Sequence, residues 1–185
     1  MIINPANIQF TLKMKCKNHN LSKKTMTKLL KLRHSAYRCK DSEETREFYE
    51  EFLELKLVKV LEIKNTKTDR KTNALHTFYQ LKDGSCIAFF EEPETEFNFK
   101  KQRDFDLHIA FEVSESDLHR MFKKGNNSEI ETRGIIDHGF IKSIYFRDPN
   151  GYVIELTYPI EKLNNNSYET NIKILKGWQD QKSIP

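Results

Sequence analysis

The sequence lacks long apolar runs, and this absence limits the classes of protein to which it can belong. No stretch of its 185 residues is apolar for long enough to cross a lipid bilayer. Its N-terminus also lacks a compact apolar segment that ends in small residues, the pattern of a secretory signal. We therefore expect no membrane-spanning segment, no membrane partner and no export.

Cysteine is scarce as well. The three cysteines, Cys16, Cys39 and Cys86, are odd in number, and their spacings match neither a metal-binding knuckle nor a disulfide framework. Free thiols persist in a reducing compartment. The sequence therefore predicts a cytoplasmic protein.

Acidic residues are absent from the first 33 positions, which hold eight lysines and arginines, whereas the whole chain has a net charge of +4. A nucleic-acid-binding surface would interleave basic residues with aromatic ones, but this stretch offers only Phe10. We predict that residues 1–28 form a flexible basic N-terminal extension and that nucleic acid is not a partner.

The remainder of the chain contains an internal repeat. The segment that begins at His34 aligns with the segment that begins at His108, and an alanine and an aromatic residue then coincide in the two copies. Each copy reads as a short strand followed by a helix start. The first helix is expected to open at Asp41 or Ser42, and the second to open at Ser114 and stop at Gly125.

After each helix the pattern changes to three strands, so each half reads βαβββ. The expected strands are 56–64, 74–81 and 85–91 in the first half, and 129–136, 140–147 and 151–158 in the second. Turn residues of the type Asp-Gly and Asp-Pro-Asn-Gly join the last two strands of each half. We predict modules at 32–92 and 104–158 within one domain of residues 29–158. A C-terminal helical tail is expected over 159–185.

A βαβββ unit covers one face of its sheet with its helix and leaves the other face bare, so two units can curve around a cavity. The predicted fold is α+β, with paired βαβββ modules that form a curved eight-stranded mixed sheet around a metal cavity. Alternation along the last strands places Ser143, Tyr145 and Glu155 on the inward face. An inward carboxylate in an apolar strand requires a charged partner.

Three residues are candidate metal ligands. His34 and His108 occupy equivalent positions in the repeat, and Glu155 faces inward. A lone histidine is more often structural than a ligand, but two equivalent histidines and a carboxylate form a set that suits Fe(II), Mn(II) or Zn(II). The position that matches Glu155 in the first half is Ala88, which leaves three protein ligands.

The paired pattern from Leu32 to Tyr158 resembles the vicinal oxygen chelate superfamily, which includes glyoxalase I, fosfomycin-resistance proteins and extradiol ring-cleavage dioxygenases. Within it, residues 136–155 resemble the extradiol signature: His138, then Tyr145 after an aliphatic residue, then Asp-Pro-x-Gly, then Glu155. This resemblance implies a dioxygenase that cleaves a catechol-like ring.

The same resemblance implies one divalent ion, with Fe(II) expected and Mn(II) or Zn(II) as alternatives. It implies an aromatic diol and O₂ as partners, and it is compatible with a homodimer. It implies catalytic roles for His138 and Tyr145. Extradiol enzymes also carry an acid–base histidine on the last strand of the first module, where this chain has none. His76, one strand earlier, is the candidate replacement, or else a surface residue at a strand end.

Two other functions stay open. A glyoxalase-like lyase or isomerase, or a fosfomycin-type thiol transferase, would use the same scaffold. Glyoxalase I usually needs a fourth ligand, which Ala88 does not supply, whereas fosfomycin-resistance proteins share the two histidines and the glutamate. A metal-free drug-binding resistance protein is the other alternative, although such proteins generally lack the ligand triad.

Overall fold

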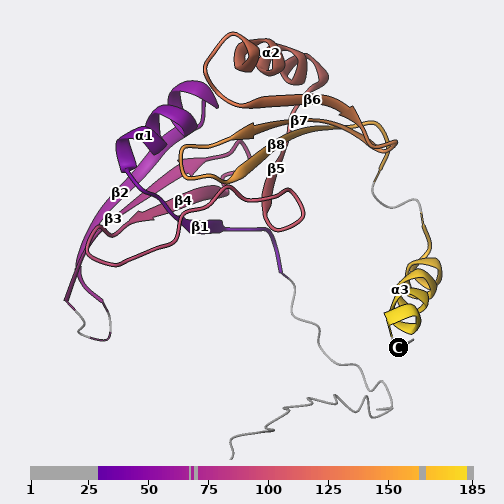
Figure 1. Ribbon diagram of the computed structural model, residues 1–185, viewed down its shortest axis with the longest axis horizontal. Coiled ribbons are helices and arrows are strands. Elements are labelled where there is room, and N and C mark those ends of the chain that lie inside the picture. The colour runs from indigo at the N-terminus through magenta and orange to yellow at the C-terminus, as the bar shows by residue number, and fades with distance from the viewer. Residues whose placement is uncertain (1–28, 67, 69–70, 163–165, 183–185) are drawn as a thin grey trace, which may run out of the picture. The chain divides into compact units, whose positions relative to one another are not determined.

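The computed structural model describes residues 29–66, 68, 71–162 and 166–182 (Figure 1). The chain divides into two units, residues 1–31 and 32–185. The predicted N-terminal extension, residues 1–28, lies outside the described residues. All helices and strands considered below belong to the second unit.

Two four-stranded mixed sheets contain the eight strands. In the first module the elements are β1 (His34–Arg38), α1 (Ser42–Arg46), η1 (Glu47–Phe52), β2 (Lys56–Asn65), β3 (Lys71–Gln80) and β4 (Cys86–Glu91). In the second they are β5 (His108–Glu112), α2 (Glu115–Asn126), β6 (Thr132–Asp137), β7 (Ile141–Arg147) and β8 (Val153–Pro159), and α3 (Tyr168–Lys182) follows.

The strand orders are β1-β4-β3-β2 and β5-β8-β7-β6, and the first pair in each sheet is parallel while the others are antiparallel. The predicted α+β class with paired βαβββ modules is confirmed. β1 and β5 occupy equivalent edge positions in the two sheets.

The helices begin where their capping residues predict. The side chain of Asp41 accepts hydrogen bonds from the backbone N–H groups of Glu43 and Glu44, and the Ser114 hydroxyl accepts one from Asp117 N. The predicted stop of the second helix at Gly125 is wrong, because α2 continues to Asn126. Gly125 serves close packing, since a Cβ there would lie 2.6 Å from the Phe146 ring.

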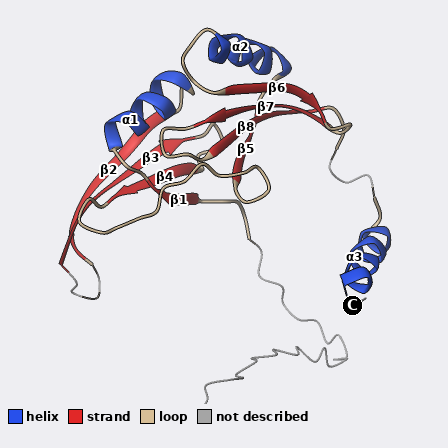
Figure 2. Cartoon of the chain, in the orientation of Figure 1, coloured by secondary structure: helices blue, strands red, loops and turns tan. Residues whose placement is uncertain are grey.

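One face of each sheet is covered by the helix of its own module. α2 lies against β6, β7 and β8, and α1 lies against β4 (Figure 2). Tyr49 of η1 and Leu118 of α2 are fully buried in a common core with Phe89 and Ile144. Within the described ranges, no helix is both long enough and apolar enough to span a membrane.

The turn between β7 and β8 connects the two modules through the buried carboxylate of Asp148. Its Oδ2 accepts a hydrogen bond from the Tyr49 hydroxyl of the first module at 3.1 Å. Its Oδ1 accepts the backbone N–H groups of Asn150 and Tyr152 at 2.9 and 2.8 Å. Burial raises the pKa of Asp148, and burial followed by the charge of Asp148 raises the pKa of Tyr49 well above its usual value.

Asn150 adds a second connection at the same place. Its side-chain oxygen accepts the backbone N–H of Lys40 at 2.8 Å, and its amide donates to Thr45 Oγ1 at 3.3 Å. The rings of Phe52 and Phe146 pack nearly at right angles, with ring centres 5.0 Å apart. The contact between the modules is therefore polar at the turn and aromatic beside it.

We predict that Tyr49→Phe lowers the free energy of unfolding by about 1 kcal/mol, because Asp148 loses one buried hydrogen bond. Asp148→Ala should cost about 3 kcal/mol, because several buried donors then lack an acceptor. Urea unfolding would measure both values. Tyr158→Phe is the control, since the described residues show no partner for that half-buried hydroxyl. Equal losses for Tyr49→Phe and Tyr158→Phe would contradict this role of Asp148.

Candidate metal centre

His108 is the first residue of β5, and a hydrogen bond to the backbone fixes the orientation of its ring. Nδ1 lies 2.7 Å from the backbone oxygen of Asp104. Because a carbonyl oxygen only accepts hydrogen bonds, Nδ1 carries the proton and the neutral ring keeps a lone pair on Nε2. That nitrogen lies 3.3 Å from Glu155 Oε2. Such a backbone contact is the usual support of a metal-binding histidine.

Glu155 lies in the middle of β8, is only 4% exposed, and faces the side of the sheet opposite to α2, where the described residues form no helix. Its Oε1 accepts a hydrogen bond from Ser143 Oγ at 2.5 Å and one from the Tyr145 hydroxyl at 3.3 Å. No Lys or Arg in the described part of the chain forms an ion pair with it. A buried carboxylate beside an imidazole lone pair is an arrangement that a cation would stabilise.

Tyr145 connects this pair to two further side chains. His138 Nε2 lies 2.9 Å from the Tyr145 hydroxyl. The guanidinium of Arg133 lies 4.8 Å from the centre of the Tyr145 ring, and it also pairs with Asp104 at 2.5 Å. Burial, followed by the charge of Glu155, raises the pKa of Tyr145. The phenol therefore stays protonated at neutral pH and can donate.

His34 lies on the other sheet. It is exposed at the start of β1, and its ring contacts the edge of Phe78 with centres 5.7 Å apart. Among the residues that the structure describes, no three His, Cys, Asp or Glu side chains gather closely enough to hold a metal ion. One chain thus brings together His108 and Glu155 and leaves His34 apart.

The strand register shows which residue of the first sheet stands in the place of Glu155. Ala88 pairs with Ala36 in the parallel register of β1 and β4, as Glu155 pairs with Ala110 in that of β5 and β8. The positions that the repeat aligned, Ala88 and Glu155, are therefore equivalent in the strand pairing as well. Of the three candidate metal ligands, the first module contributes only His34.

His76 lies on the uncovered face of the first sheet. The interpretation of His76 as a surface residue at a strand end is wrong, because β3 extends to Lys71 and the side chain is 7% exposed. Nδ1 lies 2.9 Å from the Phe89 carbonyl oxygen, and the ring stacks on Phe90 at 3.6 Å. Burial, followed by the nearby His34, lowers the pKa of His76, so the ring is neutral at pH 7.

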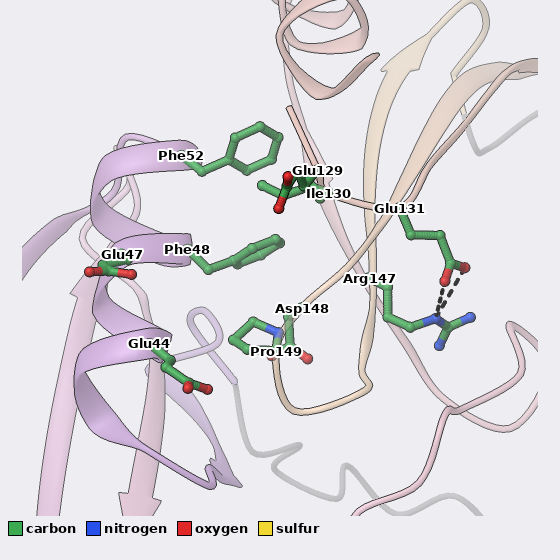
Figure 3. A pocket seen from close by; sticks show the side chains of 10 residues that line it. All are labelled: Glu44, Glu47, Phe48, Phe52, Glu129, Ile130, Glu131, Arg147, Asp148 and Pro149. Atoms are coloured by element: carbon green, nitrogen blue, oxygen red, sulfur yellow. Dashed lines mark hydrogen bonds and ion pairs between the residues drawn. The ribbon is translucent and has the colours of Figure 1, made fainter. Parts of the chain in front are cut away.

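Two cavities of similar size have different chemistry. One, of about 610 Å³, contains His108 and Glu155 and is bordered by Phe140 and Ile160. The other, of about 480 Å³, lies between the modules; Phe48 and Phe52 point into it, and half of its ten lining residues are carboxylates (Figure 3). Its one cation, Arg147, already pairs with Glu131. The second cavity contains none of the candidate ligands and would repel an anion.

Sequence reasoning did not identify Arg133, and it had no signal for the Asp104 carbonyl. Alternation on β6 places Arg133 opposite Tyr145, as the register shows. Strand alternation could therefore have indicated Arg133, but a bulge between Gly134 and Ile136 interrupts that alternation. The contact of Asp104 with His108 uses a backbone atom, which any residue would provide.

Comparison with known proteins agrees with this fold. The family model described as "Glyoxalase/Bleomycin resistance protein/Dioxygenase superfamily" matches residues 31–156. A curated relative, metallothiol transferase FosB of Shouchella clausii (strain KSM-K16), is 31% identical over 90 residues, which are 43% of this chain and 56% of that protein. The chain thus spans little more than half the length of this relative.

Solved structures show the same fold. A variant of fosfomycin resistance protein FosX from Listeria monocytogenes, complexed with Mn(II) and 1S,2S-dihydroxypropylphosphonic acid, superposes with a TM-score of 0.53 at 17% identity, covering 78% of this chain and 99% of that one. A glyoxalase/dioxygenase from Nostoc punctiforme gives 0.55 at 21% identity, with 71% and 92% covered. At these identities the likeness concerns the fold alone.

These relatives correct the predicted activity. The prediction of an extradiol dioxygenase acting on an aromatic diol with O₂ is wrong, because the curated relative is a metallothiol transferase and several similar structures are FosX proteins. Part of the apparent extradiol signature serves the fold, since Asp148 and Asn150 hold the modules together. The superfamily, whose members bind a divalent metal and act on small molecules, is confirmed. The chain belongs to the Glyoxalase/Bleomycin resistance protein/Dioxygenase superfamily.

Proposed function

We propose that this protein is a metal-dependent transferase that adds a thiol to a small anionic electrophile of the fosfomycin type. The observation that carries the proposal is the His108–Glu155 pair, in which His108 Nε2 lies 3.3 Å from an oxygen of the buried carboxylate. The relation to metallothiol transferase FosB supports the reaction class. A cytoplasmic location, where low-molecular-weight thiols are reduced, stays a prediction.

The proposed metal ligands are His34, His108 and Glu155. The residues fit a divalent ion because an imidazole nitrogen of His108 lies 3.3 Å from an oxygen of the buried Glu155 carboxylate, and no Lys or Arg among the described residues pairs with that carboxylate. A bound divalent ion would act as a Lewis acid on a substrate oxygen. Ser143 holds the Glu155 carboxylate in place by its hydrogen bond.

The groups around the pair suit an anionic substrate. The Arg133 guanidinium lies over the Tyr145 ring and pairs with Asp104, and it would exchange that partner for a substrate anion. The Tyr145 hydroxyl is a protonated donor that can turn toward a substrate oxygen, with His138 as its second partner. A phosphonate offers several oxygens to such donors, and guanidinium groups bind anions of this shape well.

The third ligand requires a second copy of the chain. His34 lies on edge strand β1 and His108 on edge strand β5, at equivalent places in the repeat. A twofold assembly brings the same surface of each copy to its partner, so His34 of one copy would meet His108 and Glu155 of the other. The uncovered face of the first sheet carries Leu61, which is 38% exposed, and would be covered in the process.

We expect protein loaded with Mn(II) to convert fosfomycin to an adduct with glutathione or L-cysteine, detected by mass spectrometry and phosphorus NMR. His108→Ala and Glu155→Ala should abolish both metal binding and turnover, because each removes a ligand. His119→Ala on the exposed side of α2 is the matched control. If metal-loaded wild type consumes fosfomycin only by adding water, or not at all, thiol transfer is the wrong reaction class.

The shared centre has its own test. Purified His34→Ala and Glu155→Ala proteins should each lack metal, but mixing them in equal amounts and allowing subunits to exchange should restore about a quarter of the wild-type sites. Half of the dimers would then be mixed, and each mixed dimer would have one intact centre. Equilibrium dialysis with Mn(II) would count the sites. No recovery after proven exchange would place all three ligands in one chain.

A further inference from the structure

Helix α3 has an apolar stripe that no other part of the described chain covers. Tyr168, Ile172, Leu175 and Trp178 recur at spacings of three and four residues, which aligns them along one side of the helix. Trp178 is 57% exposed and Leu175 56%, and no residue of α3 is buried. An isolated helix of 15 residues is marginal in water, so this one requires a packing partner.

The cavity around His108 and Glu155 has a matching apolar rim. Phe140 is 41% exposed and Ile160 44%, and they are adjacent, because Ile160 N donates to the Phe140 carbonyl at 2.8 Å. Ile141 and Pro159 line the same cavity. We call these four residues the rim patch: Phe140, Ile141, Pro159 and Ile160.

We propose that α3 docks its apolar stripe on the rim patch of its own chain and thereby closes the cavity. The chain length supports this partner. Residues 161–167 are the only connection between the patch and the helix, and seven residues span at most about 25 Å. A short tether keeps the local concentration of α3 near the patch at roughly millimolar levels, so a modest contact is enough for docking.

The groove between the modules is a poorer partner for α3. Lys173 and Lys176 would complement its carboxylates, but its aromatic floor is already covered: Phe48 is 5% exposed and Phe52 7%. The rim patch offers exposed apolar side chains instead. Apolar area removed from water is the main favourable contribution when a tethered helix packs.

The functional meaning rests on the proposed function. When α3 covers the rim, water is displaced from the space above His108 and Glu155. Electrostatic attraction between the proposed metal centre and an anionic substrate is then less screened. α3 would therefore act as a lid that closes over a bound substrate.

Trp178 makes docking directly measurable, because it is the only tryptophan in the chain. Packing that covers about half of an indole should lower the acrylamide quenching constant about twofold. We expect quenching in the full-length wild type to be weaker than in Phe140→Ser by about that factor. Phe105→Ser, at a side chain that is fully exposed, is the matched control and should resemble wild type.

A second pair of variants examines the helix itself. Leu175→Ser should increase Trp178 quenching as Phe140→Ser does, whereas Lys173→Ser, off the stripe, should not. Trp178 quenching as strong in wild type as in Phe140→Ser would overturn the proposal. So would protection of Trp178 that disappears on dilution to the monomer, because the helix would then be covered by another copy.

The position of the helix over the metal cavity has a separate readout. Bound Mn(II) should broaden the Trp178 indole N–H resonance in wild type, and Phe140→Ser should restore the sharp signal without loss of metal. A sharp signal with Mn(II) bound would place α3 elsewhere and overturn the lid. If wild type binds no Mn(II), the proposed metal centre fails, and the quenching results alone decide whether α3 docks.

Discussion

A single buried carboxylate, Asp148, holds the arrangement on which the rest of the molecule depends. It accepts hydrogen bonds within its own turn and from Tyr49 of the other module, so it joins a local turn to a contact across 99 positions of sequence. β8 starts directly after this turn and carries Glu155. The buried charge of Asp148 is tolerated because each of its oxygens accepts hydrogen bonds, and the same hydrogen bonds fix the conformation of the turn.

Local and periodic features of the fold were predictable from the sequence, and features that depend on how modules meet were not. Capping by Asp41 and Ser114, and the inward direction of Glu155 and Ser143, follow from short-range chemistry and strand alternation. The separation of His34 from Glu155 could not be predicted in this way. Repeat symmetry shows which positions are equivalent in the two modules, but it does not show whether modules that face each other belong to one chain or to two.

The incorrect activity has a related cause. Tyr145, Asp148 and Glu155 form a pattern that several chemistries share, and here Asp148 is part of the scaffold. What distinguishes the surroundings of Glu155 is that Arg133 lies over the ring of Tyr145, the hydrogen-bond partner of that carboxylate, and pairs with Asp104. These contacts join residues far apart in sequence, or use a backbone oxygen, so no short motif records them. Fold and ligand type are therefore easier to read from a sequence than reaction type.

The alanine at position 88 has a consequence for how a substrate would lie in the proposed shared centre. Had the two modules kept identical residues, both walls of the cavity would carry a carboxylate. In the proposed centre, the second sheet would contribute Glu155 with Tyr145 near it, whereas the first sheet would contribute only hydrocarbon at the matching level, where Ala88 is buried and pairs in register with Ala36 and Phe78. A cavity with one charged wall and one hydrocarbon wall favours a molecule with a head and a tail, and it admits that molecule in one orientation.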